Sequence, residues 1–122
     1  ALASLALPVS MSSLTAWGND YPDGFEAAIE RDLEAMAKSG DVLIAISTSG
    51  KAKNLRRALA WSRSHRLATI AISGNGPLAN EFGHLADDHI CIPSDKTARV
   101  QEGYQVVVHI LCAYIDRVGG TA

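Results

Sequence analysis

The sequence lacks the features that would assign it to a membrane or to nucleic acid. Its apolar runs all fall short of the roughly 20 residues needed to cross a bilayer. Its 11 Lys and Arg against 13 Asp and Glu leave a net charge of −2, which gives no general attraction to nucleic acid or anionic lipid. The opening Ala1–Pro8 is apolar without a basic flank, so it resembles a strand more than a secretion signal. We therefore expect neither membrane nor nucleic acid among its direct partners.

Cysteine is also scarce, with two residues in the chain. Cys91 and Cys112 show no metal-ligand spacing, and each lies in an apolar run. We expect both thiols to be buried and reduced, which favours a cytoplasmic location.

What the sequence does contain is a regular alternation of apolar runs and helical patterns over one domain, residues 1–122. Polar, turn-rich residues predict a loop over Trp17–Gly24. The expected strands are Ala3–Val9, Val42–Ile46, Ala68–Ile72 and His89–Ile92. The expected helices are Phe25–Ser39, ended by Gly40, then Lys53–His65, Leu78–Phe82 and Thr97–Val118. This order predicts an α/β fold with a parallel sheet and helices on both faces.

Two of these segments are apolar enough to suggest how they are covered. Val42–Ile46 is continuously apolar, as in strands covered on both faces. Thr97–Val118 is apolar on most sides, which is typical of a helix buried on most sides, often at a subunit interface.

The most informative stretch is Asp41–Lys51, an apolar strand followed by Ser47, Thr48, Ser49 and Gly50 at the start of a helix. Unpaired N–H groups and the dipole at a helix N-terminus favour an anion, and hydroxyls add donors. The glycine and lysine spacing matches neither a Walker A loop nor a dinucleotide fingerprint, so a small phosphorylated ligand is favoured. The alternative is an ordinary helix cap, since Ser and Thr are common there.

Two other places carry candidate site residues. Asn19 and Asp20, in the predicted loop, suit contacts to sugar hydroxyls, although they could equally stabilise a turn. Gln101 and His109 lie on one slowly rotating stripe of the last predicted helix, about 12 Å apart along its axis. His109 stands in an apolar run, so it is either a core histidine or an imidazole tuned for proton transfer.

These residues resemble the sugar isomerase (SIS) domain family, and most closely its phosphoheptose isomerases. The stretch Asp41–Gly50 is similar to the family's serine-rich loop. Gly18-Asn19-Asp20, the Ala71–Gly74 strand end, and Ala98–Glu102 followed by His109 match further motifs in the family's order.

The resemblance implies a flavodoxin-like fold and a homotetramer with sites shared between subunits. Ser47, Thr48 and Ser49 would hold the phosphate, with Asn19, Asp20 and Gln101 at the sugar and His109 as an acid/base. The reaction would convert sedoheptulose 7-phosphate into glycero-manno-heptose 7-phosphate through an enediol. No cofactor is firmly implied, but some family members bind zinc, here through Gln101 and His109.

The chain also departs from that pattern. We expect it to lack the family's N-terminal helices and first strand, with their catalytic glutamate, and therefore to be a poor catalyst on its own. Ala52 and Ala98 stand where isomerases usually have serine and aspartate. Ala98 resembles non-catalytic members that bind a replication initiator protein. Two hypotheses follow: a sugar-phosphate isomerase, or a non-enzymatic module that binds a phosphosugar or a protein.

Overall fold

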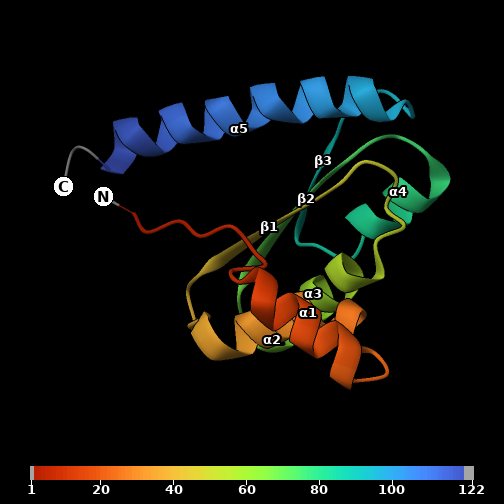
Figure 1. Ribbon diagram of the computed structural model, residues 1–122. Helices are drawn as coiled ribbons and strands as arrows, with labels where there is room; N and C mark the ends of the chain where they lie inside the picture. Colours follow the sequence, from red (N-terminus) through yellow and green to blue (C-terminus); the bar gives the residue numbers. More distant parts are fainter. Residues whose placement is uncertain (1, 120–122) are drawn as a thin grey trace.

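The computed structural model describes residues 2–119 and shows helices on both sides of a central sheet (Figure 1). The helices are α1 (Met11–Asp20), α2 (Gly24–Met36), α3 (Lys53–Ser64), α4 (Pro77–Gly83) and α5 (Thr97–Gly119). The strands are β1 (Val42–Ser47), β2 (Ala68–Ser73) and β3 (Asp88–Cys91). In Figure 1, α1, α2 and α3 lie below the sheet and α5 lies above it.

The sheet is parallel, with strand order β1-β2-β3 among the described residues. Ala45 pairs with Ala71, and Ser47 pairs with Ser73, so both strands end at the same level. Ser73 pairs in turn with Cys91 at the end of β3. The register therefore brings the loops after β1 and β2 to one edge, where ligands bind in such sheets. The predicted α/β class with helices on both faces is confirmed.

One core lies between the sheet and the helices below it. Ala45, Ala71, Leu59 and Phe82 form a buried cluster in which α3 and α4 meet β1 and β2. A second cluster joins Ile29 and Leu33 of α2 to Ala58 of α3. Ala58, Leu59 and Ser62 are all buried, so α3 turns one face toward the core.

The N-terminal region differs from its prediction. The expected strand Ala3–Val9 is not formed within the described residues, since Val9 N–H donates to Asp32 Oδ2 on α2 at 3.0 Å rather than to a strand. The expected loop Trp17–Gly24 is confirmed only at residues 21–23, because Trp17–Asp20 belong to helix α1 and Gly24 begins α2. Helix α1 begins with Ser10 Oγ accepting a hydrogen bond from Ser13 N–H. Trp17 stacks on Tyr21 and lies under Arg31 of α2, so packing against α2 outweighs the turn-forming composition.

The helix after this region also ends earlier than expected. α2 stops at Met36 rather than Ser39. Gly40 has φ +97° in the turn that leads into β1, so it does not terminate the helix directly. Asp41 Oδ2 accepts from Lys38 N–H at 2.8 Å and stabilises that turn.

Coverage of the upper sheet face and of α5 is lower than predicted. Val42 and Ile44 are 56% and 42% exposed, so β1 is not covered on both faces in this chain. In α5, Val100 is the buried residue, and the rest of the helix is half-buried or exposed.

Cys91 and Cys112 are free but exposed, so the prediction that both are buried is wrong. No helix in residues 2–119 has the length and apolarity needed to cross a membrane.

Candidate phosphate-binding site

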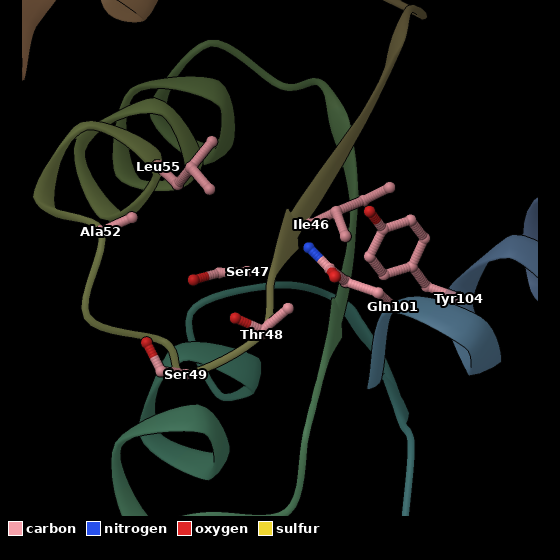
Figure 2. A pocket seen from close by; sticks show the side chains of 8 residues that line it. All are labelled: Ile46, Ser47, Thr48, Ser49, Ala52, Leu55, Gln101 and Tyr104. Atoms are coloured by element: carbon pink, nitrogen blue, oxygen red, sulfur yellow. The ribbon is translucent and has the colours of Figure 1, made fainter. Parts of the chain in front are cut away.

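A cavity of about 420 Å³ opens at the carboxyl end of β1, beside the segment 47–52, which we call the serine loop. Figure 2 shows the cavity between this loop and the first turns of α5. Its lining residues are Ile46, Ser47, Thr48, Ser49, Ala52, Leu55, Gln101 and Tyr104. The volume is in the usual range for small-molecule sites. Three adjacent hydroxyl residues therefore face one cavity of suitable size.

The hydroxyls of the serine loop do not cap the helix that follows. The residue before α3 is Ala52, which makes no side-chain capping hydrogen bond. Ser47, which is 8% exposed, instead accepts from Gly50 N–H at 3.1 Å through its Oγ, and its own hydroxyl proton stays available for donation. The alternative prediction of an ordinary Ser/Thr cap is therefore wrong, and the side chain that accepts from the first turn of α3 is that of Asn54, whose Oδ1 lies 2.9 Å from Leu55 N.

The loop after β2 supports the serine loop from the side. Gly74 N–H donates to Thr48 O at 3.2 Å. A side chain at Gly74 would approach Ser94 O and Thr48 O to 2.5 and 2.9 Å, so this contact needs glycine. Ser73 is fully buried and bonded within the protein, so it is not free to contact a ligand.

Ser73 belongs to a short chain of hydrogen bonds behind the site. Its Oγ lies 2.7 Å from His89 Nε2 and 3.1 Å from Ala79 O on α4. Because a carbonyl can only accept, Ser73 donates to it and His89 Nε2–H donates to Ser73. Burial, with the charge of His84 as a smaller cause, lowers the pKa of His89. This neutral histidine joins β3 to β2 and α4.

The structure brings some of the predicted site residues together and not others. Ser47, Thr48, Ser49 and Gln101 line the same cavity. Asn19 and Asp20 end α1, are exposed, and lie outside its lining. His109 is exposed two turns beyond Gln101 and does not line the cavity either, so within this chain it is neither a core histidine nor a desolvated one. Lys51 is exposed outside the lining as well.

Gln101 and His109 do not form a metal site by themselves. Residues 2–119 contain no group of three or more His, Cys, Asp or Glu side chains that could hold an ion. The eight-residue separation on a straight helix places the two predicted zinc ligands about 12 Å apart along its axis. Within this one chain the two predicted ligands do not converge on one ion, and we derive no step through zinc.

Two residues at the site had not been predicted to take part. Tyr104 lines the cavity one turn after Gln101, from the same helix. The spacing of three residues was a usable signal, because such positions share a helix face. Arg56 contacts the serine loop from outside the cavity, donating from Nε to Gly50 O at 2.8 Å. That contact depends on the loop's tertiary path and has no local signature.

The chain has an α/β fold similar to that of solved phosphoheptose isomerases. The proteins it is similar to are phosphoheptose isomerases. The curated one from Dechloromonas aromatica is 41% identical over 118 residues, and that from Bordetella avium is 43% identical, each match covering 94% of this chain and 58% of the relative. The chain thus spans about three-fifths of the length of these relatives. No family model matches it.

Solved structures agree with the sequence matches. The phosphoheptose isomerase of Neisseria gonorrhoeae superposes with a TM-score of 0.82 at 34% identity, over 94% of this chain and 62% of that one. The enzyme from Francisella tularensis gives a TM-score of 0.76 at 31% identity, over 88% and 58%. The resemblance inferred from the serine loop and the later motifs is confirmed.

Proposed function

We propose that this chain is the phosphosugar-binding part of an isomerase that interconverts sedoheptulose 7-phosphate and the corresponding aldose 7-phosphate. The observation that carries the proposal is the serine loop, whose three hydroxyl residues line one cavity while leaving the helix uncapped. Its relatives are named phosphoheptose isomerases. In this proposal the loop N–H groups and hydroxyls bind the phosphate, and Gln101 contacts the sugar.

No charged side chain among residues 2–119 lines the cavity, so dipoles and hydroxyls would have to stabilise the anion. Ile46, Leu55 and the Tyr104 ring supply apolar walls. Such walls suit the C–H faces of a sugar, while Gln101 and the Tyr104 hydroxyl suit its oxygens. The cavity therefore fits a ligand with a phosphate at one end and a polyol at the other.

Proton transfer between C1 and C2 needs an acid/base group at the sugar end. No carboxylate or imidazole among residues 2–119 lines the cavity, so in this proposal the acid/base groups come from outside this chain's own cavity wall. His109 remains the proposed imidazole. His109 would reach a bound sugar only if a second copy of the chain brought it to the cavity. We therefore propose a homotetramer with sites shared between subunits as the working assembly. We also propose that this assembly is located in the cytoplasm.

Ser49→Ala tests the phosphate assignment. Loss of a donor to a bound anion should weaken sedoheptulose 7-phosphate binding by about 1–3 kcal/mol, measured by titration calorimetry. Ser12→Ala, an exposed serine on α1, is the matched control and should bind like the wild type. Equal binding by Ser49→Ala and the wild type would remove the serine loop from the site.

The second candidate is a non-catalytic module that binds a phosphosugar or a protein. It is favoured by the position of His109 away from the cavity and by the absence of a side-chain donor at Ala52. The complete gene product separates the candidates when sedoheptulose 7-phosphate turnover is followed. Isomerisation that is lost in His109→Ala, with binding retained, supports the enzyme; binding without isomerisation by the wild type supports the module.

A further inference from the structure

Arg56 joins the serine loop to α4. Its Nε donates to Gly50 O at 2.8 Å, and its Nη2 donates to Leu78 O at 3.0 Å. The side chain is 28% exposed, and Glu81 Oε2 lies 3.7 Å from Nη2. One guanidinium on α3 thus binds carbonyl oxygens of two segments that are far apart in the sequence.

The two segments are already in close backbone contact. Gly50 has φ +70°, and a Cβ built there would lie 2.2 Å from Leu78 O. Two carbonyl oxygens therefore converge on Arg56 where the loop passes α4. Removing the guanidinium would take this donor away from both carbonyl oxygens. Leaving a partly buried carbonyl oxygen without a donor is unfavourable.

Holding Gly50 O also orients the loop's amide groups. In a trans peptide the C=O and the following N–H point in opposite directions. Arg56 fixes the Gly50–Lys51 peptide, and Gly74 N–H fixes the Thr48–Ser49 peptide through Thr48 O. The N–H groups of Lys51 and Ser49 consequently point away from these partners. The carbonyl oxygens of Gly50 and Thr48 would repel an anion, but each is bonded to a donor.

We propose that Arg56 is a positioning residue of the phosphate site: it holds the serine loop against α4 in the conformation that presents N–H groups to the anion. The proposal rests on the proposed function of the serine loop. Arg56 does not line the cavity, and it reaches the serine loop through its bond to Gly50 O while Leu78 O holds it to α4. The arrangement depends on two hydrogen bonds from one planar group, a geometry that lysine does not reproduce.

Arg57 offers a matched control on the same helix. Its Nε binds Glu30 Oε2 at 2.6 Å and its Nη1 binds Asp23 Oδ2 at 2.6 Å, so it joins α3 to α2 and to the turn before it. Within residues 2–119 its guanidinium bonds to these two carboxylates and not to the serine loop. Removing either arginine costs two hydrogen bonds, but only Arg56 holds Gly50.

The experiment compares Arg56→Met, Arg56→Lys and Arg57→Met in the complete gene product. Sedoheptulose 7-phosphate is titrated by calorimetry, and Tm is measured in parallel. Arg56→Met should raise Kd at least tenfold, and Arg56→Lys should raise it less. Arg57→Met should lower Tm comparably while its Kd stays within twofold of the wild type. Circular dichroism checks folding, and Arg56→Lys decides the outcome if Arg56→Met does not fold.

The results separate the two proposals. Wild-type Kd in the Arg56 variants, with weaker binding by Ser49→Ala, would overturn the role of Arg56 while keeping the phosphate site. An equal rise in Kd in Arg57→Met would reduce Arg56 to a general structural role and also overturn the proposal. No binding by the wild type would overturn the proposed function and, with it, the role of Arg56.

Discussion

Gly50 is the residue on which the shape of the serine loop depends most. Its φ of +70° lies in the left-handed region, and an added Cβ would be 2.2 Å from Leu78 O. Such a contact cannot relax cheaply, because the atom it meets belongs to the backbone. Glycine is therefore required here for both conformation and space.

Gly50→Ala should destabilise the protein by about 1–3 kcal/mol, since it combines backbone strain with displacement of α4. Denaturant unfolding measures this loss. Gly18→Ala is the matched control, because nothing lies within 4 Å of a Cβ at that helical position. That substitution should be neutral or stabilise by about 0.5–1 kcal/mol. Equal free energies of unfolding for the two variants would show that the serine loop can move away from α4 without destabilising the protein.

At the scale of elements, His89 links β3 to β2 and α4 through Ser73. Its Nε2–H is used by Ser73, so a second proton must enter at Nδ1. A Cβ at Gly83 would lie 2.2 Å from Nδ1, so that nitrogen is packed against the end of α4. This packing explains why burial is the main cause of the lowered pKa of His89.

The lowered pKa of His89 predicts a loss of stability in mild acid. Well above pH 6.5, the ordinary pKa of histidine, the imidazole is neutral in both states and has no effect on folding. Below that pH the unfolded chain takes up a proton that the folded protein resists, so the free energy of unfolding falls until the pH reaches the folded pKa. Urea unfolding between pH 7 and 5 measures the slope. His89→Gln should flatten it, and an unchanged slope would assign the effect to other groups.

At the scale of the whole molecule, α5 leaves a long apolar stripe uncovered. Val106, Ile110 and Tyr114 are spaced by four and are 61%, 62% and 64% exposed. The exposed Val42 and Ile44 of β1 add to the apolar surface of this chain. Contiguous apolar surface of this kind usually marks an interface. It is consistent with the proposed assembly of several copies.

Ile110→Glu should therefore shift the protein toward smaller species, because a charge would be buried in the interface without a partner. Sedimentation velocity of the complete gene product measures the shift. Ser39→Glu adds the same charge at an exposed position in the turn between α2 and β1 and should sediment like the wild type. Unchanged assembly in Ile110→Glu would place the interface elsewhere.

The sequence alone determined the features that local patterns encode. The apolar runs at Val42–Ile46 and Ala68–Ile72, separated by a helical pattern, were enough for the parallel sheet and for helix α3. The three hydroxyl residues after the first run predicted one wall of the cavity. In open α/β sheets, ligands bind beyond the carboxyl ends of the strands, where these residues lie. Gln101, singled out by the stripe that it shares with His109 and by the Ala98–Glu102 motif, lines the same cavity.

Only the tertiary structure decided the rest. α1 formed in spite of turn-rich residues because Trp17 packs against α2, which a local pattern does not contain. Cys112 and His109, expected to be buried from their apolar neighbours, lie exposed because no segment within residues 2–119 covers that part of α5. The contact of Arg56 with Gly50 and Leu78 depends on residues up to 22 positions apart meeting in space. Periodicity reports which face of an element is apolar, whereas long-range packing decides what meets that face.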